Sequence, residues 1–586
     1  MKVGYILEMR EPGNGFFQIT MNIDSVSEDI TMITMPAWTP GSYAIRDYSR
    51  NVRTLRAKTP ENEPIEIQKK DKSTWKLING NNKTFSVSYE VYAGEFSVRG
   101  SHLDTTHGYL NGTNVFMYVE GYKDQSVELI IKPQEDWKIS TGMERIGENK
   151  FRATNYDIFA DCPIEIGTHR SLLFTVDGKE HEIALYGSGN ENTERLVEDF
   201  KKIVETTKSI FGSLPYRRYV FILHLTDRGS GGLEHLNSNT IDYSRFTFTD
   251  PKDYHSFLSV VSHEYFHLWN VKRIRPTELG PFNYKDENYT TLLWVSEGIT
   301  NFYGNLILLR SGLISREEYF KHISEIIKGY SIQPGTRYES ASDSSFDAWI
   351  KLYRESPNNI NSYVSYYLKG EILGLMLNSR ISEYTKGQKS LDDVFRHMMD
   401  KYNKDGRGFT EKDLLSTLSE VSSLDFGPFF ARYVRGTDSI DFQNELQKIG
   451  LKLETKYSSQ KNDKETTMPY IGILVKKDKF NVYAVLEDSP GQKSGIAPGD
   501  EIVAINSFRM DARFLKPLNE RNETIFIDNF SDFKPGDRIR VQAFRRSILE
   551  TFDVTLGEAP HDTYEIREIE NVDENGKRTL EKFLMG

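Results

Sequence analysis

The stretch Phe257–Trp269 reads FLSVVSHEYFHLW and contains two histidines, His263 and His267, four positions apart. Apolar residues recur at helical spacing through and beyond it, which predicts a helix over 256–270. Residues four positions apart lie on one face of a helix, so both imidazoles can bind one metal ion. Glu264 projects beside them and can polarise a water molecule at that metal. The pattern therefore predicts a zinc-binding helix with Glu264 beside the metal.

A catalytic zinc site requires three protein ligands and one open position. No further histidine follows His267 within the next dozen residues. The candidate for the third ligand is Glu297, because it lies in the apolar stretch LLWVSEGI, where a carboxylate needs a partner. Two helices can then present His263, His267 and Glu297 to one zinc ion per chain. The alternative is a chance pattern of histidines and an ordinary surface carboxylate.

The composition is that of a globular protein of several domains, and it restricts what can bind the metal. The chain has 586 residues, 38% hydrophobic and 27% charged, so two to four domains are expected. A net charge of −11 argues against a general nucleic-acid binder. The basic run Lys272-Arg273-Ile274-Arg275 is expected to be structural or a local counter-charge. A single cysteine, Cys162, excludes disulfides within the chain and cysteine-ligated metal centres, and we expect it to be buried.

No secretory signal and no apolar run of membrane-spanning length is found in the sequence. A cytoplasmic location without a membrane partner is therefore expected.

Hydrophobic patterns divide the chain into segments. Residues 84–94 and 126–133 alternate between apolar and polar side chains, which is typical of half-buried antiparallel strands. From about residue 190 the spacing becomes helical, Gly212 ends a helix, and Arg218–Leu225 follows as a buried strand. Further helical patterns fill 315–450, with a capping box at Thr410, and strand patterns return after about residue 460.

These patterns predict a multidomain α+β protein of five segments. They are an N-terminal antiparallel β domain (1–170), a catalytic domain (171–330), an α-helical domain (331–455), a small β-rich domain (460–560) and a C-terminal tail (561–586) that ends in a docked helix.

Two strings around these residues, HEYFHLWNVKRIRP and LLWVSEGITNFYG, closely resemble the glycyl aminopeptidase family of zinc metallopeptidases. These enzymes are gluzincins, and their catalytic domain is related to that of the aminopeptidase-N-like family. WTPGSY at 38–43, followed by Ile45-Arg46-Asp47, is similar to the N-terminal signature of the same family. The resemblance implies a thermolysin-like catalytic domain in which His263, His267 and Glu297 are the zinc ligands and Glu264 is the base.

The segment GGLEH, residues 231–235, is similar to the GxMEN motif of the aminopeptidase-N-like enzymes, with Leu in place of Met and His in place of Asn. In that motif the glutamate binds the free α-amino group of the substrate. An ammonium group buried without a counter-charge is costly, so an aminopeptidase needs such a carboxylate. The resemblance assigns Glu234 as the amine anchor and Gly231 and Gly232 to substrate binding. A glycine-rich turn with an exposed glutamate is the alternative.

The segment Tyr367-Leu368-Lys369-Gly370 is similar to the YxKG segment of the same enzymes, in which the tyrosine hydroxyl stabilises the oxyanion. That role requires a neutral donor aimed at the developing negative charge. Tyr363 and Tyr366 lie close in sequence, and a tyrosine that only packs is a further alternative.

In the N-terminal signature, Tyr43 and Arg46 are candidates for lining the substrate cleft. A structural pair between Arg46 and Asp47 is the alternative.

Residues 465–557 resemble a PDZ domain of the bacterial type. Tyr470-Ile471-Gly472-Ile473 is similar to its carboxylate-binding loop, and VLEDSPGQKSGIAPGDEI at 485–502 is similar to its core. This fold binds extended peptides by adding a strand to a sheet. A PDZ domain that only packs on the catalytic domain is the alternative. Residues 508–530 look like an insertion.

Together these features predict a zinc-dependent aminopeptidase that acts on peptides with a free N-terminus. The resemblance implies a preference for small N-terminal residues, Gly or Ala, and a possible peptide C-terminus in the PDZ groove. Two rivals remain: a metalloendopeptidase whose PDZ domain recruits substrates, and a peptide-binding scaffold with a vestigial metal site. The physiological substrate and the oligomeric state do not follow from the sequence.

Overall fold

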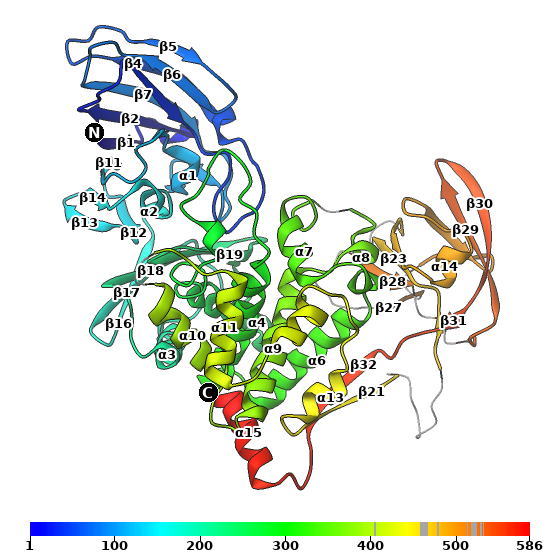
Figure 1. Ribbon diagram of the computed structural model, residues 1–586. Coiled ribbons are helices and arrows are strands. Elements are labelled where there is room, and N and C mark those ends of the chain that lie inside the picture. Colours follow the sequence, from blue (N-terminus) through cyan, green and yellow to red (C-terminus); the bar gives the residue numbers. More distant parts are fainter. Residues whose placement is uncertain are drawn as a thin grey trace. The chain divides into compact units, whose positions relative to one another are not determined.

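The computed structural model describes residues 1–354, 356–403, 406–457, 467–476, 480–511, 514–516, 524–527, 530 and 532–586. The chain divides into two compact units. The first consists of Met1–Thr290, Thr300–Ile314 and Asp392–Thr417, and the second of Thr291–Ile299, Ser315–Leu391 and Leu418–Gly586. Figure 1 shows that strands dominate the blue and cyan N-terminal part, whereas helices predominate from green to yellow. The expected mixed α+β organisation is confirmed.

The N-terminal part of the first unit is β-rich, as the alternation predicted. β7 (Phe85–Tyr92) and β11 (Val127–Lys132) lie within the two predicted strands. β7 pairs antiparallel with β2 (Phe16–Asp24), as predicted. β11 pairs antiparallel with β14 (Lys150–Ala153) but parallel with β1 (Lys2–Glu8), so the prediction of a purely antiparallel sheet is wrong at this pair. Every second residue of β7 is buried in the core, namely Phe85, Val87, Tyr89 and Val91.

Three sheets build this part, with strand orders β13-β14-β11-β1-β2-β7-β4, β10-β3-β6-β5 and β12-β15-β9-β8. The remaining elements are β3 (Ile30–Thr34), β4 (Val52–Lys58), β5 (Glu66–Lys69), β6 (Thr74–Ile78), β8 (Ser101–Leu103), β9 (His107–Leu110), α1 (Gly112–Val115), β10 (Tyr118–Val119), β12 (Lys138–Thr141), β13 (Glu144–Gly147), α2 (Tyr156–Ala160) and β15 (Ile164–Gly167).

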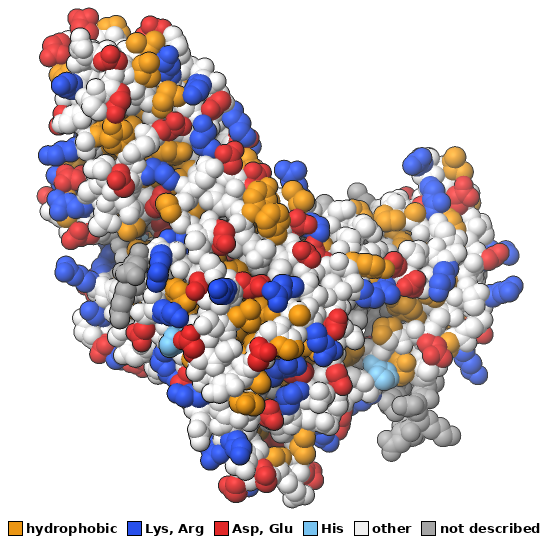
Figure 2. All heavy atoms as spheres, viewed as in Figure 1, with side chains coloured by type: hydrophobic (Ala, Val, Ile, Leu, Met, Phe, Trp, Pro, Cys, Tyr) orange, Lys and Arg blue, Asp and Glu red, His pale blue; other side chains and the backbone are white. Residues whose placement is uncertain are grey.

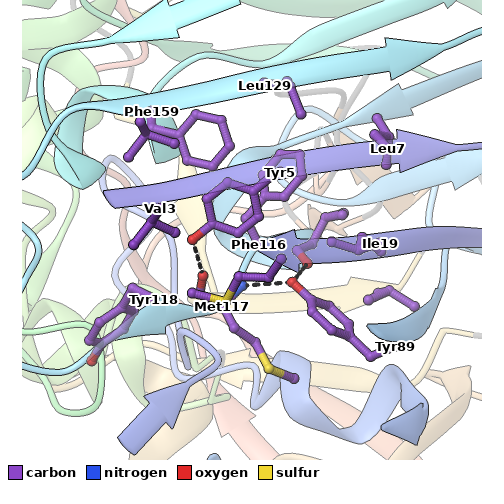
Figure 3. Packing of buried hydrophobic residues seen from close by; sticks show 14 of the residues in the cluster. Val3, Tyr5, Leu7, Ile19, Tyr89, Phe116, Met117, Tyr118, Leu129 and Phe159 are labelled. Carbon is purple, nitrogen blue, oxygen red and sulfur yellow. Dashed lines mark hydrogen bonds between the residues drawn. The ribbon is translucent and has the colours of Figure 1, made fainter. Parts of the chain in front are cut away.

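Buried tyrosines fix the packing of this β-rich core (Figure 3). The Tyr5 hydroxyl donates to the carbonyl oxygen of Met117 at 2.5 Å, and its ring stacks on Phe159. The Tyr89 hydroxyl donates to the carbonyl oxygen of Val115 and accepts from the backbone N–H of Met117. Since a buried hydroxyl without a partner is costly, these bonds select one arrangement of the core.

A five-stranded sheet of order β16-β17-β18-β20-β19 follows in the first unit. Its central strand β18 (Arg218–Thr226) is buried along nearly its whole length, as expected for this stretch. β18 runs parallel to β17 (Lys179–Tyr186) and β20 (Ser238–Ser244), whereas the edge strands β16 (Arg170–Val176) and β19 (Ser230–Glu234) are antiparallel to their neighbours.

Helices of the first unit follow the predicted patterns with shifted ends. α3 (Thr193–Phe211) ends at Gly212, which adopts a positive φ of 85°. α4 (Pro251–Phe266) starts earlier than predicted because Asp250 caps it and Pro251 suits its first turn. It also ends before residue 270, since the chain turns after His267.

The other helices of this region are α5 (Thr300–Arg310), α10 (Leu391–Tyr402) and α11 (Glu411–Ser422). The predicted capping box of α11 is present: the N–H of Thr410 donates to the Asp413 carboxylate, and the N–H of Asp413 donates to the Thr410 hydroxyl. Cys162 is buried, as expected.

The second unit combines a helical region with a β-rich C-terminal part. Its helices are a π-helical segment (Trp294–Ile299), α6 (Arg316–Ser331), α7 (Ala341–Phe346), α8 (Asn359–Ser362), α9 (Tyr366–Tyr384), α12 (Gly427–Phe429), a second π-helical segment (Phe430–Val434), α13 (Phe442–Gln447) and α15 (Glu574–Met585). α9 is largely buried and contacts α6, α7, α13 and α15, so it is the central helix of this region.

The β-rich C-terminal part contains two four-stranded sheets, β24-β23-β28-β27 and β26-β25-β29-β30, around a shared apolar core. The predicted insertion 508–530 lies partly outside the described residues. The elements are β21 (Leu451–Lys456), β22 (Pro469–Tyr470), β23 (Ile473–Lys476), β24 (Val482–Val485), α14 (Pro490–Lys493), β25 (Glu501–Ile505), β26 (Phe508–Arg509), β27 (Leu515–Lys516), β28 (Thr524–Ile527), β29 (Arg538–Arg545), β30 (Ile548–Thr555), β31 (Gly557–Glu558) and β32 (Thr563–Glu568).

Acidic and basic side chains are interspersed over the face of the protein visible in Figure 2. Among the described residues, no helix is both long enough and apolar enough to cross a membrane.

The C-terminal helix α15 docks in the second unit, as the sequence predicted. Phe583 and Leu584 are fully buried, and the side-chain amide of Asn378 on α9 donates to the carbonyl oxygen of Phe583 at 3.0 Å.

We predict that Phe583→Ala lowers the free energy of unfolding by about 3–5 kcal/mol, because it removes a fully buried aromatic ring and leaves a cavity. Met585→Ala is the matched control: Met585 lies on the same helix but is 48% exposed, so a change below about 0.5 kcal/mol is expected. Urea unfolding of both variants tests this docking, and equal effects would contradict it.

Candidate active site

His263 and His267 lie one helical turn apart, His263 within α4 and His267 at its C-terminal cap. Their Nε2 atoms are 2.9 Å apart, and the ring planes are nearly perpendicular. The Nδ1 atom of His267 is 2.7 Å from the carbonyl oxygen of Asn270. Because a carbonyl oxygen only accepts, this Nδ1 carries the hydrogen and leaves a lone pair on Nε2. Two ring nitrogens directed at one point are suited to bind a metal ion.

Asn270 supports the histidine pair, and this role of Asn270 was not predicted from the sequence. Its side-chain amide donates to the hydroxyl of Thr300 at 3.0 Å, so the turn after α4 is tied to the start of α5. The hydrogen bond from Nδ1 of His267 to the carbonyl oxygen of Asn270 fixes the tautomer and the ring orientation of this histidine. The only indication of this role in the sequence is that Asn270 belongs to the string HEYFHLWN, which carries the family resemblance.

Glu264 is buried and lies directly against the edge strand β19. A Cβ atom added to Gly232 would come within 2.3 Å of Glu264 Cγ and 2.4 Å of Oε1. A side chain at position 232 would therefore displace the carboxylate of Glu264 from its observed position, whereas glycine leaves room for it. Glu234, Glu264 and His267 each offer a ligand atom within 4.8 Å of the others.

Gly231 has a φ of 144°, a conformation that side chains rarely adopt. The two predicted substrate-binding glycines thus have distinct roles in the structure: Gly231 allows the strand's backbone conformation, and Gly232 makes room for Glu264.

Glu234 is only 4% exposed and belongs to a row of alternating charges. Lys272 Nζ lies 3.8 Å from Glu234 Oε1 and 2.8 Å from Asp161 Oδ1. Burial raises the pKa of Asp161, but Lys272 and His235 outweigh this effect and hold it below its usual value. The row Asp161, Lys272, Glu234 contains two acidic side chains and one lysine.

The basic run is structural, as expected. Arg273 donates to the backbone carbonyl oxygens of Leu236, Leu268 and Pro215, and Lys272 forms the ion pairs described above. Asp161 carries no signal in the sequence that relates it to this site, because the contact joins residues 111 positions apart.

The N-terminal signature reaches Glu234 through Gly41. A Cβ atom at this position would lie 2.6 Å from Glu234 Oε2 and 2.7 Å from Oε1, and Gly41 has a φ of 84°. Tyr43 and Glu234 line the same cavity, which has a volume of about 500 Å³ and also includes Asp161 and Lys272. That Tyr43 lines the substrate cleft stays a prediction.

Arg46 lies elsewhere, on a separate cavity of about 540 Å³. Its guanidinium donates to the carbonyl oxygens of Ser42 and Ala44, so it holds its own loop. Asp47 forms an ion pair with Lys72 at 2.7 Å. The contacts of Arg46 and Asp47 thus differ from the predicted structural pair between them, and the substrate-binding role of Arg46 stays a prediction.

Glu297 belongs to the second unit and is almost fully buried in the π-helical segment Trp294–Ile299. Such segments are rare and often occur at functional sites. The next residue, Gly298, packs on Gly370 of α9: a Cβ atom on Gly298 would lie 2.3 Å from the Cα of Gly370. This close contact holds Glu297 and the YLKG segment side by side in the second unit.

The three candidate tyrosines differ in exposure. Tyr366 is fully buried at the start of α9, whereas Tyr363 and Tyr367 are half-buried. The rings of Tyr366 and Tyr367 stack, and Ser365 accepts a hydrogen bond from the N–H of Tyr367. A hydroxyl that contacts substrate must be accessible, which favours Tyr367 or Tyr363.

The predicted carboxylate-binding loop also lies in the second unit. Gly472 has a φ of 74°, and a Cβ atom there would lie 2.3 Å from Ser489 Cβ. Ile471 and Ile473 are buried, and Tyr470 is half-buried in β22. A second apolar cluster, which includes Leu474, Leu486 and Phe526, packs on Ile332 and Ile360 of the helical region.

Comparisons with known proteins agree with these features. Residues 4–168 match the model of the Peptidase M61 N-terminal domain, and residues 256–373 match that of M61 glycyl aminopeptidase. None of the curated proteins compared with the chain matches it.

Among solved structures, an aminopeptidase N family protein from Idiomarina loihiensis is 28% identical, with a TM-score of 0.89 over 99% of this chain and 100% of that one. Two structures of an M1 zinc metallopeptidase from Deinococcus radiodurans, one of them a mutant, are 11% identical. Each has a TM-score of 0.47 over 75% of this chain, and the alignments cover 95% and 94% of those chains. The chain is therefore similar to M61 peptidases in both matched segments, and this similarity supports peptidase activity.

Proposed function

We propose that the protein is a zinc-dependent aminopeptidase that releases small N-terminal residues, Gly or Ala, from peptides. The observation that carries this proposal is the 2.9 Å approach of the Nε2 atoms of His263 and His267, together with the cluster that His267 forms with the carboxylates of Glu264 and Glu234. A metal-binding pair, a base and an amine anchor are the groups that this reaction requires.

One zinc ion per chain would be held by His263, His267 and Glu297. Two neutral imidazoles and one carboxylate suit zinc and leave one coordination position open. The π-helical segment that carries Glu297 continues directly into α5, and α5 packs on α4 where Gly304 meets His263. When bound, zinc supplies Lewis-acid polarisation of a water molecule and of the scissile carbonyl group.

In this proposal Glu264 acts as general base and then as general acid. Its carboxylate takes a proton from the attacking water and delivers it to the nitrogen of the leaving amine. The close approach of Gly232 holds the carboxylate in one position, so little reorganisation is needed. The Tyr367 hydroxyl, or that of Tyr363, donates to the oxyanion as negative charge develops on it.

Glu234 receives the α-ammonium group of the substrate. The row Asp161, Lys272, Glu234 contains two acidic side chains and one lysine, and the ammonium group of the substrate would add a second positive charge. Lys272 lies closer to Asp161, at 2.8 Å, than to Glu234, at 3.8 Å, so Glu234 is the carboxylate proposed for the substrate. A blocked N-terminus brings no such charge, so this arrangement favours an aminopeptidase over the rival metalloendopeptidase.

Residues 465–557 are included in the proposal as a PDZ domain whose loop Tyr470–Ile473 receives a peptide C-terminus. The apolar contact of Leu474, Leu486 and Phe526 with the helical region instead supports the alternative of a module that only packs. A cytoplasmic location and the absence of nucleic-acid and membrane partners also belong to the proposal.

We predict that Glu264→Gln retains zinc but lowers kcat by roughly 100- to 10,000-fold, because the amide cannot take a proton from water. Zinc content by mass spectrometry and turnover of Gly- and Ala-amides are measured on the same preparation. Substantial turnover by this variant would contradict the role of Glu264 as base. Wild-type protein that binds no zinc would instead favour the rival scaffold.

Glu234→Gln is expected to lower kcat/KM for free aminoacyl substrates by about 10- to 100-fold, since a charge-assisted hydrogen bond is lost. The wild-type protein should refuse the same peptides when they are N-terminally acetylated. Glu61→Gln, at an exposed position, is the matched control and should leave kcat/KM unchanged. Cleavage of acetylated peptides by the wild type would favour the endopeptidase.

Gly232→Ala should reduce kcat at least tenfold while zinc content stays unchanged, because the added methyl group displaces Glu264. Gly329→Ala on α6 is the control: no atom lies within 4 Å of its Cβ position, so activity should be kept and stability raised by up to about 1 kcal/mol. Full activity of Gly232→Ala would show that the contact does not position the base.

A further inference from the structure

A second group of metal-binding side chains lies in the N-terminal β-rich part of the first unit. His102, Asp104 and His107 each offer a ligand atom, and these atoms all lie within 4.8 Å of one another. The group is formed by the hairpin of β8 and β9 and the turn between them. Neither the sequence patterns nor the proposed peptidase reaction uses it.

Strand geometry places all three side chains on one face of the hairpin. His102 and Asp104 are two positions apart, so they point to the same side. In the antiparallel ladder Leu103 pairs with Gly108, and the N–H of Asp104 donates to the carbonyl oxygen of His107. His107 is therefore opposite Asp104 and shares its face.

The turn orients the carboxylate of Asp104. Its Oδ1 atom accepts hydrogen bonds from the N–H groups of Thr106 and His107 and from the Thr106 hydroxyl. Its Oδ2 atom is 3.0 Å from Nε2 of His102. One carboxylate oxygen thus holds the turn while the other faces the histidines, as in many carboxylate ligands of metals.

His107 provides an independent observation. The residue is only 1% exposed, and among the described residues neither of its ring nitrogens has a hydrogen-bond partner. Tyr186 stacks on one face of the ring, with centroids 3.5 Å apart, and the ring of Phe96 lies edge-on at 5.0 Å. Buried polar atoms in native proteins nearly always have partners, so an orphaned imidazole beside a carboxylate and a second imidazole indicates a bound cation.

A buried carboxyl group lies near the site. Glu165 on the neighbouring strand β15 is fully buried, and burial raises the pKa of its carboxyl group. Its Oε2 atom is 2.9 Å from Nε2 of His224, and its Oε1 atom is 4.0 Å from Nδ1 of His169. A cation beside His107 would favour the ionised form of this carboxyl group.

We propose that His102, Asp104 and His107 form a second metal site that binds a divalent first-row transition metal ion such as Zn²⁺. The two imidazoles are borderline ligands, which suit Zn²⁺ better than Ca²⁺ or Mg²⁺, and Zn²⁺ also accepts a carboxylate oxygen. The site joins both strands of a short hairpin, so metal binding should stabilise the β-rich part of the chain.

To test the proposal, metal is first removed from the full chain with a chelator. The chain is then dialysed to equilibrium against buffered Zn²⁺, and its zinc content is measured. Two parents are used, the wild type and His263→Ala/His267→Ala, and each is compared with its His102→Ala derivative. We expect each derivative to bind one zinc ion fewer than its parent. This difference does not depend on whether His263 and His267 bind metal in the wild type. Equal zinc content in parent and derivative would overturn the proposal and leave an ordinary His102–Asp104 hydrogen bond.

Asp104→Asn is the second variant, because the amide oxygen can still accept the hydrogen bonds of the turn. It should weaken zinc binding at this site at least tenfold while circular dichroism remains native. In the His263→Ala/His267→Ala parent, added Zn²⁺ should raise the melting temperature, and the His102→Ala derivative should lose this shift. An identical shift in both proteins would also overturn the proposal.

Discussion

The close approach of backbone to carboxylate at two glycines is the constraint on which the candidate site depends. Gly232 allows Glu264 to lie against β19, and Gly41 allows the N-terminal loop to lie against Glu234. A methyl group at either position would come within 3 Å of carboxylate atoms, so the carboxylate would have to shift. The absence of a side chain at both positions therefore allows the two carboxylates to lie where they do.

This constraint connects parts of the chain that are far apart in sequence. The loop at Gly41 belongs to the β-rich N-terminal part, Glu234 lies on an edge strand, and Glu264 lies on α4. Each glycine contact joins two of these elements. In the second unit, Gly298 and Gly370 do the same for Glu297 and the YLKG segment. Close contacts at glycines thus bring the candidate side chains near their neighbours in each unit.

Local patterns in the sequence were sufficient for the elements but not for the contacts between them. The alternation in β7, the helical spacing around His263 and the cap at Thr410 involve neighbours in sequence, and the structure confirms all three. The ion pair of Asp161 with Lys272 and the hydrogen bond of Asn270 to Thr300 join residues far apart in sequence, so no local pattern indicated them. Helix α4 ended earlier than predicted because the chain turns after His267.

The central claim is that the histidine pair, together with Glu297, holds a zinc ion beside Glu264. A crystal of the zinc-loaded protein measured above and below the zinc absorption edge tests it most directly. The account predicts an anomalous peak bonded to Nε2 of His263, Nε2 of His267 and the carboxylate of Glu297, at about 2.0–2.2 Å from each ligand atom. Crystals of the zinc-loaded protein without a peak at these two histidines would contradict the claim. A zinc ion at the histidines that Glu297 does not contact would also contradict it.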